Sequence, residues 1–222
     1  MKYIFIILVF CIIIFVYPAK NTKIELDDTE LCPPSSYIAS TSFFTFFLEM
    51  ISDDFDSSYG QELIYIPAQE IEKRIPEYTL YHSNKYNPSV AHDIRGIAYA
   101  NSTIGRPNGI RDIAWNVYAE NKTPLVEKDP QSNYYRVYPY AGYKHSWTLV
   151  KSPPPDDGKG TPPEDWYIGH CLVLVGVYKC SIDLNYKTLR YNFGVYEHDL
   201  HLRDKIKLEI AGMFRDWEAS CR

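Results

Sequence analysis

The side chains best suited to chemistry stand in two short clusters in the last third of the chain. One is the pair His170-Cys171. Neighbours on a strand point to opposite faces of a sheet, so this pair cannot work as base and nucleophile. The other cluster combines acids and imidazoles, namely Glu197, His198, Asp199 and His201. Strand alternation brings only two of these, Asp199 and His201, to one side, which argues against a metal centre.

Composition and motifs narrow the function further. The chain contains no GxSxG, HExxH, phosphate-loop or dinucleotide fingerprint, so we expect neither catalysis nor a cofactor. A net charge of −5, from 23 basic and 28 acidic residues, excludes a strongly cationic nucleic-acid-binding protein. The 45% apolar content and 20 tyrosines are typical of a folded chain, and 222 residues predict one domain.

The chain begins with an apolar run from Tyr3 to Tyr17, preceded by Lys2. A spanning helix needs about 20 apolar residues, so this shorter run favours a signal peptide over residues 1–19. The alternative is an uncleaved membrane anchor over residues 3–19. In either case the rest of the chain lies outside the cytosol, and the protein is secreted or extracytoplasmic.

Four cysteines follow the signal segment, which is an even number in an oxidising compartment: Cys32, Cys171, Cys180 and Cys221. We expect two disulfides. The run from Trp166 to Tyr178 resembles one strand, which would place Cys171 and Cys180 about 30 Å apart. That is too far for a bond, so each should pair with Cys32 or Cys221, and both assignments stay open. No CxxC or HxxxH spacing indicates zinc.

Two sequons mark candidate glycosylation sites. Asn101 and Asn121 each begin an Asn-x-Thr triplet and would carry glycans only if the host secretes through a eukaryotic pathway. We therefore treat both asparagines as surface positions.

The elements that must position these residues begin with a polar leader over residues 20–39, which we expect to be a tether. From Ser40 to Ile51 apolar side chains point in almost every helical direction, which predicts a buried helix. A short helix opening at Pro67 would complete an N-terminal helical arm. One extracellular domain would then span residues 40–222.

Short extended runs follow from Glu77 to Thr103 and predict two or three strands. The apolar spacing from Ile110 to Tyr118 predicts an amphipathic middle helix. Residues 133–143 and 144–151 then form two aromatic and β-branched runs joined by Ala-Gly, which indicates an antiparallel hairpin.

The run from Trp166 to Tyr178 is apolar in both alternating registers, which predicts a central strand covered on both faces. Another extended run follows from Leu189. A closing helix carries one apolar stripe formed by Ile206, Ile210, Met213, Phe214 and Trp217. The expected fold is α+β: an antiparallel sheet with the helical arm, the middle helix and the C-terminal helix.

This order of elements resembles the extracellular Cache sensory domain, a PAS-like fold, over residues 78–179. The matching segments are the aromatic strand Tyr135 to Tyr140, the strand Ser146 to Lys151 and the strand that closes with Gly176-Val177-Tyr178. Two features depart from the family: the residues after Lys179 have no counterpart, and no second membrane span is present. The resemblance therefore implies the fold but not transmembrane signalling.

The resemblance implies a pocket for a short carboxylate or an amino acid between the sheet and its loops. Residues two apart on a strand lie on the same side of the sheet, so Tyr138 and Tyr140 can face the pocket together, as can His145 and Trp147. Arg111 and Trp115, one helical turn apart, would add a cation and an apolar wall, with Lys151 as a second cation.

The resemblance also implies the pairing Cys32–Cys180 and Cys171–Cys221. The alternative function is a secreted, disulfide-stabilised protein-interaction or effector domain without a small-molecule pocket. A roofed polar cavity lined by the named aromatic residues would favour the first function, and a filled core with a flat aromatic patch would favour the second.

Overall fold

The computed structural model describes residues 23–38, 61–102, 115, 125–130, 132–138, 144–153, 162–163 and 165–222. Its strands are β1 (Ile24–Leu26), β2 (Thr29–Leu31), β3 (Gln61–Ile66), β4 (Tyr81–His82), β5 (Val90–Ala91), β6 (Ile94–Ala100), β7 (Leu125–Lys128), β8 (Tyr135–Tyr138), β9 (Ser146–Val150), β10 (Tyr167–Leu174), β11 (Val177–Tyr186) and β12 (Leu189–Tyr196). Its helices are η1 (Ser35–Tyr37), α3 (Ala68–Glu72), η2 (Glu197–Leu202) and α5 (Arg203–Ala219).

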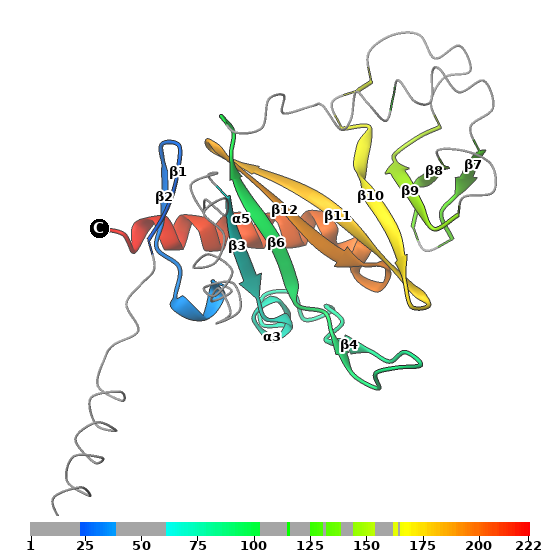
Figure 1. Cartoon of the computed structure of the whole chain (residues 1–222), viewed down its shortest axis with the longest axis horizontal. Helices are drawn as coiled ribbons and strands as arrows, with labels where there is room; N and C mark the ends of the chain where they lie inside the picture. The colour runs from blue at the N-terminus through cyan, green and yellow to red at the C-terminus, as the bar shows by residue number, and fades with distance from the viewer. Residues whose placement is uncertain are drawn as a thin grey trace, which may run out of the picture.

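Eight strands form one antiparallel sheet in the order β3-β6-β12-β11-β10-β9-β8-β7 (Figure 1). From β7 to β12 the chain meanders, each strand pairing with the next one in sequence. Two further pairs, β1-β2 and β4-β5, form separate hairpins. The long strands β10, β11 and β12 therefore build the middle of the sheet.

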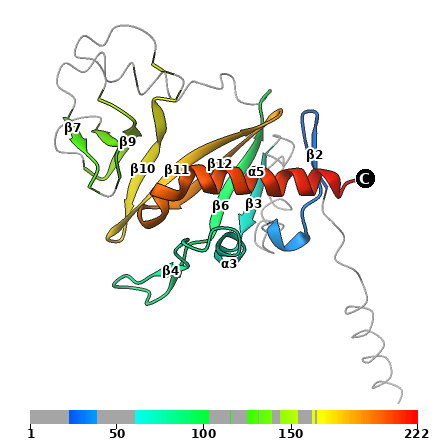
Figure 2. The ribbon, with the colours of Figure 1, turned by 180° about the vertical axis from the view of Figure 1, so that it is seen from behind.

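Helix α5 crosses one face of this sheet (Figure 2). Its predicted apolar stripe is buried, and the ring of Phe214 packs edge-on against Tyr186 and Tyr191 of the long strands. The α+β class, the antiparallel sheet and the C-terminal helix are thus confirmed. No described helix covers β3, β6 and β12 on the opposite face, which points toward the viewer in Figure 1.

The expected polar tether was wrong for the part of the leader that the structure describes. Ile24 and Leu26 of β1 are buried, as is Leu31 of β2. The backbone N–H of Cys32 donates to the carbonyl of Trp217, so this hairpin is fixed to the end of α5. Alternating apolar residues in an acidic segment were enough to make a short hairpin against the helix.

Part of the helical arm lies outside the described residues, because Ser40 to Ile51 falls there. The short helix after Pro67 is confirmed as α3. Strand β3, which precedes it, was not predicted: it pairs with β6 at the sheet edge and interrupts the arm. Of the predicted middle helix, only Trp115 is described, and it is helical.

The predicted central strand from Trp166 to Tyr178 was wrong. The chain reverses at Val175 and Gly176, so that this run forms β10 and the start of β11. By contrast, the strands expected between Glu77 and Thr103, the β8-β9 hairpin and the strand from Leu189 are all present. The error arose because Val175-Gly176 lacks the usual Asn-Gly signal of a two-residue turn, so the apolar run was interpreted as one strand covered on both sides.

The described cysteines form two disulfides, Cys32–Cys221 and Cys171–Cys180, which indicate a secreted or extracellular location. A search of the described residues for a helix long and apolar enough to cross a membrane finds none.

Candidate functional site: an apolar hairpin tip

The site that the structure singles out is the turn between β10 and β11. Leu174 pairs with Val177, which leaves Val175 and Gly176 as a two-residue loop. Both have positive φ, +47° and +90°, as a type I′ turn requires. Gly176 adopts this conformation freely, but a β-branched residue such as Val175 rarely does. The hairpin therefore holds a valine where asparagine would fit better.

A disulfide lies directly behind this turn. Cys171 and Cys180 face each other across the two strands, with their Cα atoms 3.9 Å apart, and both are fully buried. This pairing contradicts both pairings expected from the sequence, because the hairpin turn brings together residues that one continuous strand would separate. The bond fixes the register of the hairpin immediately before its end.

Beyond the disulfide, four consecutive apolar side chains are exposed. Leu172, Val173, Leu174 and Val175, here called the apolar tip, have exposed fractions of 38%, 42%, 38% and 45%. Alternation places Leu172 and Leu174 on one side of β10 and Val173 on the other, while Val175 lies in the turn itself. Single exposed apolar residues are ordinary, but a contiguous patch marks an interaction surface.

A groove of about 270 Å³ lies beside the tip, on the sheet face opposite α5. Its lining combines apolar, small, polar and cationic residues: Leu63, Arg95, Gly96, Ile97, Leu172, Leu174, Lys179, Ser181, Asn192 and Gly194. The two leucines of the tip thus also form one wall of the groove.

Lys179 is the cation in the groove without a carboxylate partner among the described residues. It pairs in register with Leu172, and its ammonium lies 5.1 Å from the centre of the Tyr196 ring. Its stem lies across Gly194, where an added Cβ would collide with Cε of the lysine. Burial, followed by the nearby Arg95 guanidinium, lowers the pKa of Lys179. An anion in the groove would oppose that effect.

Two residues of the predicted pocket, Tyr138 and Trp147, lie together but inside the core. They are 2% and 1% exposed, and their rings are 5.9 Å apart. The guanidinium of Arg136 covers the Trp147 ring at 4.3 Å. The indole N–H of Trp147 has no hydrogen-bond partner within the described part of the chain. This region is filled core, with no cavity for a ligand lined by those two rings among the pockets described.

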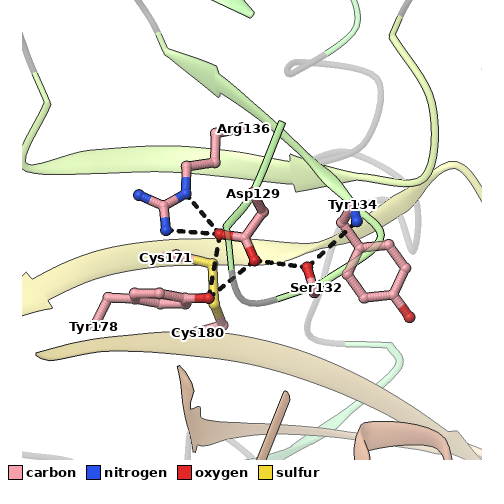
Figure 3. The surroundings of a disulfide bond; sticks show 7 residues. All are labelled: Asp129, Ser132, Tyr134, Arg136, Cys171, Tyr178 and Cys180. Atoms are coloured by element: carbon pink, nitrogen blue, oxygen red, sulfur yellow. Dashed lines mark hydrogen bonds and ion pairs between the residues drawn. A yellow bond between two sulfur atoms is a disulfide. The ribbon is translucent and has the colours of Figure 1, made fainter. Parts of the chain in front are cut away.

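The carboxylate facing Arg136 belongs to the protein itself (Figure 3). Asp129 is fully buried and accepts hydrogen bonds from Nε of Arg136 at 2.7 Å, from the Ser132 hydroxyl at 2.7 Å and from the Tyr178 hydroxyl at 3.1 Å. Burial, followed by Asp129, raises the pKa of Tyr178, which keeps its hydroxyl protonated as a donor. A buried charge satisfied in this way is already paired within the fold and is not free to bind a ligand.

The other predicted pocket residues are dispersed. His145 is exposed where β9 begins, and its carbonyl accepts a hydrogen bond from the N–H of Val173 at 2.9 Å. Lys151, at the other end of β9, pairs with Asp165. Trp115 is buried and packs edge-on against Trp166 at 4.8 Å in a second, smaller apolar cluster. Arg111 and Tyr140 lie outside the described residues.

Of the two sequons, Asn101 is described and Asn121 is not. Asn101 lies in a turn at the end of β6, half-exposed, and its side-chain amide donates to the carbonyl of Lys187 at 3.5 Å. Glycosylation remains a prediction at both asparagines.

The acid and histidine cluster is organised as a chain of hydrogen bonds. Asp199 is buried in η2, a 3-10 helix where an extended run was expected, and joins Nδ1 of His92 at 2.7 Å. Nε2 of His92 joins Nδ1 of His82 at 2.8 Å. In the neutral form of His92, Nδ1–H donates to the carboxylate and Nε2 accepts from Nδ1–H of His82. Within the described residues, no three His, Cys, Asp or Glu side chains are arranged to hold a metal ion.

Comparison with known proteins gave no match to a family model, to a curated protein or to a solved structure. The site is therefore interpreted from its own geometry. Sequence reasoning did not predict the tip, although one signal was present. A glycine, Gly176, interrupts the apolar run from Leu172 to Val177, and a glycine within a strand pattern can mark a turn.

Proposed function

We propose that this protein is a secreted or extracytoplasmic, disulfide-stabilised interaction module that docks through the apolar tip. This is the second of the two functions expected from the sequence. The observation that carries it is the exposure of four consecutive apolar residues on a hairpin that a buried disulfide holds in register. Holding apolar side chains in a fixed, solvent-exposed arrangement reduces the ordering cost of binding.

The strained turn supports the same function. Val175 costs stability at its positive φ, and 45% of its surface stays exposed. A valine that weakens the fold and remains exposed is consistent with a contact made to another molecule.

A second candidate is the binding of a short carboxylate or an amino acid, as a Cache-like domain would do. The groove favours it, because Lys179 and Arg95 offer positive charge beside apolar walls. The ligand would then bind beside β6, β11 and β12, away from Tyr138 and Trp147. A thermal-shift screen of carboxylates and amino acids tests it, since a ligand of the native state raises its melting temperature.

Three finer features also belong to this proposal. The Cache-like relationship is supported by the antiparallel order of β8, β9 and β10. The helical arm from Ser40 to Ile51 and the membrane anchor over residues 3–19 are supported by their apolar sequences. Each is compatible with a domain that works at a surface outside the cytosol.

Site-specific photo-cross-linking tests the docking function. A photoreactive phenylalanine replaces Val175 in one version of the chain and Leu208 in another. Leu208 is a matched control, because it is 64% exposed but lies on α5. We expect the photoreactive side chain at position 175 to form one defined adduct with the partner molecule, and position 208 to form no such adduct. Adding Leu174→Asp should abolish the adduct from position 175. Identical adducts from both positions, or no adduct from position 175, would contradict the proposal.

A further inference from the structure

Two hairpins project from the same end of the molecule. In both views of the chain, the β10-β11 turn and the β4-β5 hairpin extend in the same direction, away from the C-terminus of α5 (Figures 1 and 2). The β4-β5 hairpin exposes Tyr81 and Tyr86, which are 50% and 74% exposed. Six of the eight large apolar residues found exposed in the described chain belong to these two hairpins.

Both sides of the apolar tip are exposed, and this indicates what surrounds it when it is bound. A flat protein surface would cover either the side with Leu172 and Leu174 or the side with Val173, and would leave the other side in water. Inserted end-on into an apolar phase, Leu172, Val173, Leu174 and Val175 would all be buried together. Because Leu174 and Val177 are paired across the hairpin, few backbone groups would enter that phase unpaired.

The side chains around the tip have the chemistry of a bilayer interface. Tyr86 carries the ammonium of Lys85 4.6 Å from its ring centre, and Lys179 lies similarly over Tyr196. Tyrosine and lysine combine an apolar body with a polar end, and both are favoured at the level of lipid headgroups.

Three segments at this end carry lysines and no acidic residue, although the chain as a whole has a net charge of −5. The segments 81–91, 144–150 and 171–182 contain Lys85, Lys144 and Lys179 and no aspartate or glutamate. Two neighbouring carboxylates are already engaged, since Glu127 pairs with Lys144 at 2.6 Å and Asp93 pairs with Arg95 at 3.5 Å. Lys85 and Lys179 make no ion pair with any described residue, so they are available to an anionic surface.

We propose that the apolar tip inserts into the interface of an anionic lipid bilayer while Lys179, lying across Gly194, binds a lipid phosphate in the groove behind it. This inference rests on the proposed docking function and names its partner. Burial of the tip supplies the apolar part of the binding free energy. The lysines supply the preference for anionic lipid, at about fivefold in affinity per lysine.

The experiment is flotation of the secreted, disulfide-bonded protein with phosphatidylcholine vesicles, with and without phosphatidylglycerol. We expect binding to the anionic vesicles to be at least about tenfold tighter and to weaken as salt is raised. Leu174→Asp should lower the affinity at least about tenfold, and Lys85→Gln or Lys179→Gln about fivefold each. Leu208→Asp, on α5, should leave it unchanged.

Gly194→Ala provides a further test, because it displaces the end of Lys179 without removing any charge. We expect it to weaken anionic binding as Lys179→Gln does. Hydrogen exchange on the same samples locates the contact: amides of residues 172–179 should be protected by anionic vesicles, while those of α5 exchange as before. This readout is specific to the tip even if residues 3–19 are retained and attach every variant equally.

The outcomes separate the membrane inference from the docking function. Unchanged exchange at residues 172–179 overturns the membrane inference, and so does equal binding to both vesicle types by protein from which residues 1–19 have been removed. If position 175 then cross-links a protein, the docking function stands with a different partner. If position 175 gives no adduct either, both proposals fail.

Discussion

Val175 links fold stability to function at the scale of one residue. Its φ of +47° lies in the left-handed region, where a β-branched side chain is strained. Asparagine tolerates this conformation and is favoured in two-residue hairpin turns. Valine at this position is therefore unfavourable for folding, and a partner would contact its exposed side chain.

We predict that Val175→Asn stabilises the protein by about 1 kcal/mol and weakens docking. The two effects oppose each other because relief of backbone strain acts on the folded chain, while loss of the apolar side chain acts on the complex. Urea unfolding measures the first effect, and cross-linking or vesicle binding measures the second.

Lys187 supplies the control for this prediction. It has a φ of +51° in the β11-β12 turn, away from the tip, and pairs with Glu218 on the surface. Lys187→Asn should also relieve strain, with little loss from an exposed ion pair, and leave docking as it was. If Val175→Asn docks as well as the parent chain, the valine does not contribute to binding.

At the scale of elements, the two disulfides restrain different parts of the chain. Cys32–Cys221 joins the end of the β1-β2 hairpin to the end of α5 and closes a loop with a sequence separation of 189. Cys171–Cys180 closes a hairpin with a separation of 9. The first limits the unfolded chain more strongly, and the second holds the tip in register.

We therefore predict that replacing both Cys32 and Cys221 by alanine costs about 5 kcal/mol, and replacing both Cys171 and Cys180 about 3 kcal/mol. Denaturant unfolding of the two double variants measures these costs. Only the second variant should speed hydrogen exchange selectively at residues 172–179. Equal costs of the two double variants would contradict the dependence on loop length. Hydrogen exchange at the tip that is unaffected by loss of Cys171–Cys180 would show that the hairpin keeps its register without the bond.

At the scale of the whole molecule, the hydrogen-bonded series Asp199, His92 and His82 connects the β4-β5 region with η2 and so with the start of α5. Burial, followed by the neighbouring His92 and His198, lowers the pKa of His82 below its ordinary value of 6.5. The folded protein therefore binds fewer protons here than the unfolded chain. Stability is retained above about pH 6.5 and is lost as the pH falls through the lowered pKa.

We predict that the free energy of unfolding falls on acidification below about pH 6.5, with His82 accounting for at most about one proton of the slope. His82→Gln should flatten the profile between pH 5 and 7. The measurement is chemical denaturation across this range for both proteins. Identical slopes would remove His82 as the source of the acid sensitivity.

The local pattern of the sequence was sufficient for many elements. One apolar stripe identified α5, a proline opened α3, and two β-branched runs around Ala-Gly identified the β8-β9 hairpin. Each of these signals resides in a few neighbouring residues and depends little on what packs from elsewhere. The expectation of two disulfides outside the cytosol also came from the sequence.

Only the tertiary structure decided the partners of the cysteines and the place of the tip. A run that is apolar in both registers is compatible with burial on both faces and equally with exposure on both, because burial depends on segments that arrive from elsewhere in the chain. A turn formed by Val175 and Gly176 lacks the usual Asn-Gly signal, so the strand seemed continuous. Once the chain reverses there, Cys171 meets Cys180, and the apolar residues beyond them stay between 38% and 45% exposed.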